Sequence, residues 1–220
     1  QQTGWRLFFT QHGQFVTPEL LNEMDMFIMC RGKNPDLLGY SSDSVVEHRP
    51  AGSEWMTDAQ EDAIVDNVHR GMGLICMHGS LRHPDRPKLQ KLVGMSSAPN
   101  HGPQQHIKFH SINQDHPITE GVEEFSATDQ QFGPPVSENE VTVLFKGRAE
   151  REEKDDYAGW CLDRGKGRIV TLLPGHGSSP ITRAFFKKMM WRAAHWALKR
   201  DIPEMEFVNG VNQPWVRDRY

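Results

Sequence analysis

The sequence has few cysteines and no long apolar run. Its three cysteines, Cys30, Cys76 and Cys161, lie singly in apolar segments without paired spacing, which predicts reduced core thiols and argues against a disulfide framework. No apolar stretch approaches the roughly 20 residues that cross a bilayer, and the first residues lack the basic-then-apolar pattern of an export signal. We therefore expect a soluble protein with no membrane partner. The compartment, cytoplasmic or exported, stays open, because an export signal is removed from a mature chain.

The sequence also lacks a large charge excess, internal repeats and low-complexity tracts. Its net charge of −4, pI of about 6.3 and lack of a long basic run give no electrostatic basis for binding nucleic acid. A small neutral molecule is the expected partner. The 220 residues suit one α/β domain, which we place at residues 1–200. Residues 201–220 have little periodicity, and we expect this tail to pack across the surface or against a neighbour, which leaves a homo-oligomer open.

Apolar runs and the turns between them predict alternating strands and helices. Capping residues mark the helix over residues 57–70, where Thr57 and Gln60 form a capping box and Gly71 suits the C-terminal cap. Residues 163–167 join the last two strands as a hairpin. The expected strands are residues 5–9, 26–30, 73–77, 105–112, 141–145, 157–162 and 168–173, and the other expected helices are residues 17–21, 87–93 and 182–198.

Two histidines directly follow predicted buried strands. His78 ends the run over residues 73–77, and His176 follows the strand over residues 168–173 after Pro174 and Gly175. Ligands of open parallel sheets bind just beyond the carboxyl ends of the strands, so the two imidazoles predict a site. The alternative for each is a hydrogen-bonded histidine in a tight turn. Arg31, just past another strand, contacts a ligand or forms a surface ion pair.

Six short segments, taken in order and spacing, carry a resemblance to a known family. They are residues 17–21 leading into 25–28, residues 71–74 leading into His78, residues 115–121, residues 128–129, residues 165–168 leading into 174–176, and the terminal helix with Trp196. From about Gly4 to Leu198 the chain resembles the trehalose-utilisation, or ThuA-like, family of class I glutamine-amidotransferase-like folds. The resemblance implies a flavodoxin-like three-layer α/β sandwich, with a mostly parallel sheet and helices on both faces. It also implies a further strand and helix before the point where this sequence begins.

The resemblance places polar site residues at His78, His101, Asp129 and His176. We expect the three histidines to converge around a divalent metal, zinc or manganese, or around a sugar carbonyl, with Asp129 as ligand or proton shuttle. The alternatives are a solvated loop for His101 and a turn cap for Asp129. Gln130 stands where the family often has glutamate, which removes a carboxylate. Gln130 and Arg31 are the candidate substrate-binding residues.

The resemblance implies work on oxidised sugars. We expect a small-molecule keto-sugar substrate whose carbonyl moves from C3 to C2 by enediol proton transfer, with His78 and Asp129 as catalytic residues. The alternatives are a non-catalytic sugar-binding or regulatory protein, and a hydrolase or lyase of a keto-glycoside. Glutamine amidotransferase chemistry is not expected, because His78 occupies the turn that holds the nucleophilic cysteine in those enzymes, and Cys76 lies two residues earlier.

Overall fold

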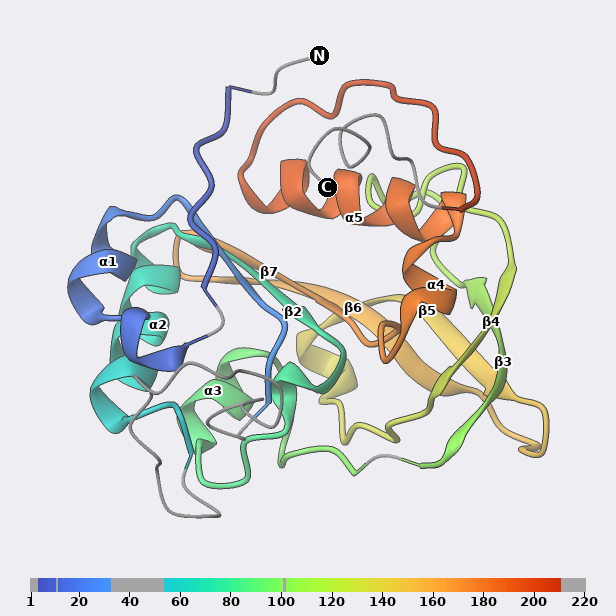
Figure 1. The fold of residues 1–220 in the computed structure, drawn as a ribbon, viewed down its shortest axis with the longest axis horizontal. Helices are drawn as coiled ribbons and strands as arrows, with labels where there is room; N and C mark the ends of the chain where they lie inside the picture. The colour runs from blue at the N-terminus through green and yellow to red at the C-terminus, as the bar shows by residue number, and fades with distance from the viewer. Residues whose placement is uncertain (1–3, 11, 33–53, 101, 211–220) are drawn as a thin grey trace, which may run out of the picture.

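A computed structural model describes residues 4–10, 12–32, 54–100 and 102–210, and a seven-stranded sheet runs through its centre (Figure 1). The order of the strands across the sheet is β1-β2-β7-β6-β5-β3-β4. Their bounds are β1 Met26–Met29, β2 Gly73–Met77, β3 Gln104–Ser111, β4 Phe125–Gln130, β5 Thr142–Ala149, β6 Asp156–Arg164 and β7 Gly167–Leu172.

The sheet is mixed, so the prediction of a mostly parallel sheet was wrong. Among the described strands, β1 pairs with β2 and β2 with β7 in parallel, whereas the pairs β7–β6, β6–β5, β5–β3 and β3–β4 are antiparallel. Parallel strands need a long crossover, usually a helix, while antiparallel strands can be joined by a tight turn. The predicted hairpin is such a turn, because Arg164 pairs with Gly167 across a two-residue loop.

Two strand predictions also differ from the structure. Residues 5–9, predicted as a strand, belong to no strand, and Leu7 and Phe9 are 84% and 85% exposed. An apolar run cannot form a ladder without a neighbouring strand. Strand β4, in contrast, was not predicted, because Ser126, Thr128 and Gln130 interrupt its apolar pattern.

The helices confirm the predicted caps. The Thr17 hydroxyl accepts the backbone N–H of Leu20 over 3.2 Å. Thr57 and Gln60 form the capping box, and Gly71 ends the second helix with a φ of 135°. The helices are α1 Pro18–Glu23, α2 Asp58–Arg70, α3 Pro87–Leu92, α4 Ser178–Ile181 and α5 Ala184–Ala197, with 3-10 turns at Gly13–Phe15, His78–Leu81 and Glu138–Glu140.

Helices cover both faces of the sheet, which confirms the predicted three layers (Figure 1). Leu74 of β2 packs in the cluster that includes residues of α1, α2 and α3, whereas its neighbour Ile75 packs in the opposite cluster with Met189 of α5. Both side chains are fully buried. A strand buried on both faces needs a continuous apolar run, which is why β2 is visible in the sequence.

The sheet curls so that its last edge strand meets the segment after β7. Four antiparallel pairings separate β4 from β7, so the two strands point the same way and end at the same edge of the sheet. Helix α4, directly after this segment, lies against β4 (Figure 1). The Ser179 hydroxyl accepts the backbone N–H of Thr128 over 3.1 Å. The carboxyl ends of β1, β2, β7 and β4 therefore face one region.

The described part of the tail, residues 201–210, packs along α5. The indole N–H of Trp191 donates to the carbonyl oxygen of Pro203 over 3.0 Å, and the Lys187 ammonium donates to that of Val208 over 2.8 Å. Residues 211–220 lie outside the described residues. None of the helices in the described ranges has the length and apolar character needed to span a bilayer.

Candidate functional site

His78 stands at a sharp elbow where β2 ends. Its φ of 48° is in the left-handed region, which among the described non-glycine residues only Lys199 shares. Such a conformation costs about 1–2 kcal/mol for a residue with a Cβ and often marks a functional position. The Nδ1 atom lies 3.0 Å from the carbonyl oxygen of Leu173. A carbonyl only accepts, so in the neutral ring Nδ1 carries the proton and Nε2 is the acceptor nitrogen.

His176 faces His78 across the ends of β2 and β7. Its Nδ1 lies 3.3 Å from Nε2 of His78, and the ring centroids are 5.3 Å apart. Because Nε2 of a neutral His78 accepts, the neutral pair places the proton on Nδ1 of His176. Gly175 allows this approach: its φ is 144°, and a Cβ there would lie 3.4 Å from that of His78. The structure thus brings the two strand-end histidines together.

Asp129 holds the turn that carries His176. Its fully buried side chain accepts the backbone N–H of Gly175 over 2.7 Å, that of His176 over 3.0 Å and that of Gln130 over 2.9 Å. A buried carboxylate requires such donors. These contacts are with the backbone, and they do not test the predicted role of Asp129 as ligand or proton shuttle.

Phe132 supports the other ring and was not singled out from the sequence. Its side chain is 3% exposed, and its ring lies edge-on to that of His78, with centroids 4.8 Å apart and planes at 86°. An apolar wall of this kind lowers the local dielectric and fixes the rotamer of the imidazole. The signal was a single aromatic three residues after Asp129, which sequence spacing could not place under His78.

The remaining predicted residues are placed less fully. Arg31 lies two residues after the end of β1 and is half-buried, with its backbone carbonyl 3.4 Å from Nε2 of His83. Gln130 ends β4 and is also half-buried. The predicted substrate-binding roles of both stay predictions. His101 lies outside the described residues.

The described part of the site has two imidazole nitrogens that could serve as metal ligands. Within the described ranges, no group of three or more His, Cys, Asp or Glu side chains is placed to hold a metal ion. Two nitrogens at about 2.0–2.1 Å from a tetrahedral zinc would lie about 3.3–3.4 Å apart. The 3.3 Å between Nε2 of His78 and Nδ1 of His176 fits this value, and the Nδ1 contact of His78 with a carbonyl is a common support for a ligating imidazole.

Comparison with known proteins identifies the family. The family model for ThuA, described as trehalose utilisation, matches residues 2–197. The chain belongs to the ThuA family. No curated protein matches the sequence significantly.

Solved structures show that this ThuA-family chain shares its fold with proteins of low sequence identity. A ThuA-like protein from Bacteroides uniformis has a TM-score of 0.66 at 19% identity, covering 90% of this chain and 79% of the other. A ThuA-like protein from Parabacteroides merdae has a TM-score of 0.57 at 16% identity, covering 67% and 68%. A cytoplasmic protein from Salmonella typhimurium has a TM-score of 0.55 at 15% identity, covering 87% and 76%.

The thiol nearest the elbow is unsuited to nucleophilic chemistry. The Cys76 side chain is fully buried within β2, and this burial, together with the nearby Cys30, raises its pKa far above the ordinary value of a thiol. The thiolate is the reactive form of cysteine. The ThuA chain therefore carries an imidazole, and no reactive thiol, at the turn after β2.

Proposed function

We propose that this ThuA-family protein isomerises a 3-keto-glycoside to the 2-keto sugar by enediol proton transfer. The observation that carries the proposal is the imidazole of His78, held at a strained elbow with Nδ1 on the Leu173 carbonyl and Nε2 facing His176. An imidazole that acts as general base must be held in one orientation with one nitrogen unprotonated, and it needs a neighbouring group that can supply a proton to the substrate. Both requirements are met here by described atoms.

The first proton transfer is assigned to His78. Its Nε2 removes the proton from C2 of the sugar, and the electron pair of that C–H bond forms the C2–C3 double bond while the C3 oxygen gains the negative charge. The resulting imidazolium keeps its Nδ1–H bond to the Leu173 carbonyl, 3.0 Å away, which stabilises the cation. The Phe132 ring keeps one side of the imidazole dry, which strengthens that interaction.

The second group is His176. Its Nδ1–H donates to the developing C3 oxygen and supplies the proton that completes the enediol. The C2 hydroxyl then gives its proton back to Nδ1 of His176 as the C2 carbonyl forms, and the imidazolium of His78 returns its proton to C3, so both imidazoles end neutral. Atoms and charges balance, and no oxidant or reductant is consumed. Asp129 acts here as a positioning residue, because it fixes the backbone of Gly175 and His176.

A second form of this proposal places a divalent ion between the imidazoles. His78 and His176 would hold zinc or manganese together with His101, and the 3.3 Å separation of the two nitrogens supports this form. A bound ion would polarise the carbonyl oxygen of the sugar. The metal content of protein purified without chelator, compared with that of His78→Asn, tests it directly. Binding of one ion by the wild type and none by the variant is expected.

Two other functions in sugar metabolism remain as alternatives with distinct outcomes. Gln130, in place of a carboxylate, favours a non-catalytic sugar-binding protein that kept the pocket. A hydrolase or lyase would release the group attached at C1 of the sugar. The partner in each case is a small sugar or keto-sugar.

The test is exchange of the C2 proton. The protein is incubated with methyl 3-keto-glucoside in heavy water, and the C2 proton is followed by NMR. Loss of that signal with appearance of a 2-keto sugar is expected for wild type and for His69→Ala, whose exposed side chain lies at the end of α2, but not for His78→Asn. Line broadening of the substrate without exchange would support the binding protein. Release of methanol would support the hydrolase or lyase.

A further inference from the structure

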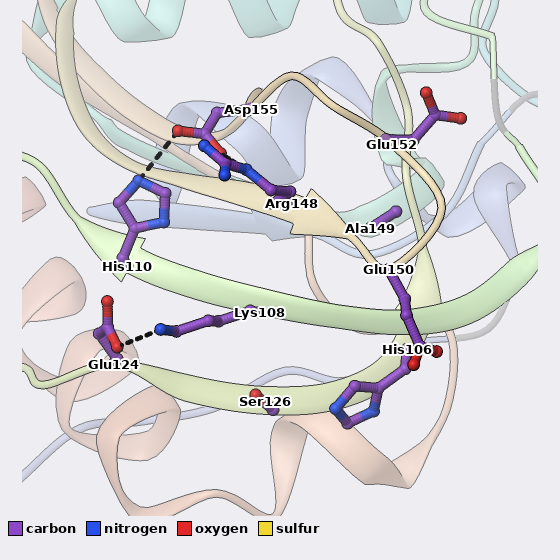
Figure 2. Close-up of a pocket in the computed structure, with 10 residues that line it drawn as sticks. All are labelled: His106, Lys108, His110, Glu124, Ser126, Arg148, Ala149, Glu150, Glu152 and Asp155. Atoms are coloured by element: carbon purple, nitrogen blue, oxygen red, sulfur yellow. Dashed lines mark hydrogen bonds and ion pairs between the residues drawn. The ribbon is translucent and has the colours of Figure 1, made fainter.

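The outward face of β3, β4 and β5 forms a polar hollow of about 490 Å³ (Figure 2). His106, Lys108 and His110 alternate with Ile107 and Phe109 along β3, and all three line the hollow. Their neighbours Ile107 and Phe109 point into the core, at 1% and 3% exposure. A polar sheet face is ordinary, but this one is enclosed along one side by the loop between β5 and β6.

The hollow shares a loop with a second cavity that reaches one wall of the candidate site. That cavity, of about 390 Å³, is lined by Gln131 and Phe132 and shares the loop residues Glu152 and Asp155 with the first. Phe132 is the residue whose ring touches His78. The amide of Gln131 donates to the carboxylate of Asp156 over 2.9 Å. The two cavities therefore border one loop, and one of them begins at the wall of the candidate site.

The lining alternates donors and acceptors. The ammonium of Lys108 lies 2.7 Å from the carboxylate of Glu124, and the guanidinium of Arg148 lies 2.7 Å from that of Asp155. Nε2 of His110 lies 3.3 Å from the other oxygen of Asp155. Figure 2 shows Lys108 with Glu124 on one side, and Arg148 and His110 with Asp155 on the other. The hydrogen bond from Arg148 lowers the pKa of Asp155, so the carboxylate stays charged.

The charges of the lining select a class of ligand. Four carboxylates, those of Glu124, Glu150, Glu152 and Asp155, outnumber the two permanent cations, Lys108 and Arg148, which disfavours phosphates, nucleic acids and other anions. Charged donors beside charged acceptors suit a neutral ligand rich in hydroxyl groups, because each hydroxyl can accept from one and donate to the other. The volume falls within the range of small-molecule sites.

We propose that this hollow is a saccharide-binding subsite that holds the sugar units of a substrate beyond the keto-sugar, so that the substrate is an oligosaccharide. The assignment rests on the proposed function for its link to catalysis, but the binding itself does not depend on turnover. Lys108 and Arg148 hold hydroxyl groups of the distal units, and Asp155 accepts from them. Neither cation belongs to the proton-transfer machinery of His78 and His176.

Binding is measured first with sugars that cannot react. Cellotriose and maltotriose are titrated into the full chain by calorimetry, with wild type, Lys108→Ala, Arg148→Ala, His78→Asn and Lys166→Ala. Losing a hydrogen bond to a charged group weakens binding by about tenfold or more, and that loss is expected for the first two variants. Lys166, exposed on the hairpin between β6 and β7, is the matched lysine control. The proposal is overturned if Lys108→Ala and Arg148→Ala both bind the trisaccharides as tightly as the wild type does, or if the wild type binds neither trisaccharide.

Kinetics and mass measurements separate the remaining outcomes. With a 3-keto-trisaccharide as substrate, Lys108→Ala and Arg148→Ala should each raise KM about tenfold with little change in kcat. With methyl 3-keto-glucoside as substrate, neither constant should change. In a further outcome, Lys108→Ala and Arg148→Ala weaken trisaccharide binding, but neither the wild type nor any variant exchanges the C2 proton. That result would support the subsite and contradict the isomerase proposal. If Lys108→Ala instead changes the molecular mass in solution without changing saccharide affinity, the hollow is a contact between copies of the chain and the proposal fails.

Discussion

The carboxylate of Asp129 accepts the backbone N–H of His176, 47 residues later in the chain, over 3.0 Å. Asp129 lies one residue before the end of the edge strand β4, and His176 follows β7, on the far side of three intervening strands. The contact is possible because the sheet curls, and it makes the geometry of the imidazole pair depend on a buried charge. The orientation of His176 is thus determined by a strand that does not pair with β7.

Replacement of Asp129 by asparagine should destabilise the fold and impair the site. Asparagine has the same shape but presents an amide donor to the backbone donors of Gly175 and His176. At least one buried N–H then loses its acceptor, which costs about 1–3 kcal/mol. Urea unfolding should show a lower midpoint with an unchanged slope, and C2-proton exchange should slow. Asp85→Asn, on the exposed surface, serves as the control and should stay within about 0.5 kcal/mol of wild type.

His78 should be dispensable for folding and essential for exchange. Glycine adopts a φ of 48° without steric strain. The unfolding free energy measured with urea should therefore be about 1 kcal/mol higher for His78→Gly than for His78→Ala. Both variants should lose C2-proton exchange by about 10²–10⁴-fold, the usual contribution of a general base. Equal stability of the two variants would contradict the left-handed elbow, and exchange at the wild-type rate would remove His78 from the mechanism.

Lys199 tests the same conformation away from the site. It follows α5 with a φ of 55°, and the N–H of Lys199 and that of Arg200 reach back to the carbonyls of Trp196 and His195, the Schellman arrangement that favours glycine. Lys199→Gly should therefore exceed Lys199→Ala in unfolding free energy by about 0.5–1 kcal/mol. Thermal melts measure the difference, and the exchange rate should match wild type in both variants.

Acidification should destabilise the protein through His116. Burial, and then the nearby Arg168, lowers the pKa of its imidazole below the ordinary value of 6.5. The unfolded chain then binds this proton first, so the stability linked to His116 is complete above pH 6.5 and falls as the pH drops through the lowered folded pKa. The unfolding free energy should decline over this range in wild type and less steeply in His116→Asn.

The variant His116→Asn removes the titrating imidazole but can keep the hydrogen bond that the side chain accepts from the backbone. Nδ1 of His116 accepts the backbone N–H of Ile118 over 3.2 Å, and the side-chain oxygen of asparagine can replace that acceptor without titrating. The thiol of Cys161, 3.5 Å from Nε2 of His116, has a pKa raised by burial to about 12 and does not ionise in this range. Parallel slopes for the two proteins between pH 5 and 7 would rule out His116 as the source.

Local signals made part of the fold predictable. Helix α2 was found because Thr57, Gln60 and Gly71 act within one turn of its ends, and β2 because both of its faces are buried. The pairing of β3, β4 and β5 could not be found in this way, because antiparallel register depends on neighbours distant in sequence. Residues 5–9 have the apolar pattern of a strand but form none in the structure. The sequence of this segment cannot indicate whether a neighbouring strand is present to pair with it.

The same division applies to the site. His78 and His176 could be singled out because each follows a visible strand and has small residues beside it. The Leu173 carbonyl, which determines the tautomer of His78, is a backbone atom and leaves no mark in the sequence. The family resemblance pointed to Asp129 as a site residue, but its three backbone contacts depend on the curl of the sheet. His101 lies outside the described residues.

During synthesis on the ribosome, the two imidazoles emerge 98 residues apart, with β3, β4, β5, β6 and β7 between them. A nascent chain can bury Ile64 and Leu74 against each other long before its second histidine exists. The backbone of His176 also needs its hydrogen bond to Asp129, which forms only when β4 packs against the turn after β7. The growing polypeptide therefore lacks the imidazole pair until nearly all of the domain has been made, and truncated copies released early would carry a hydrophobic core without that pair.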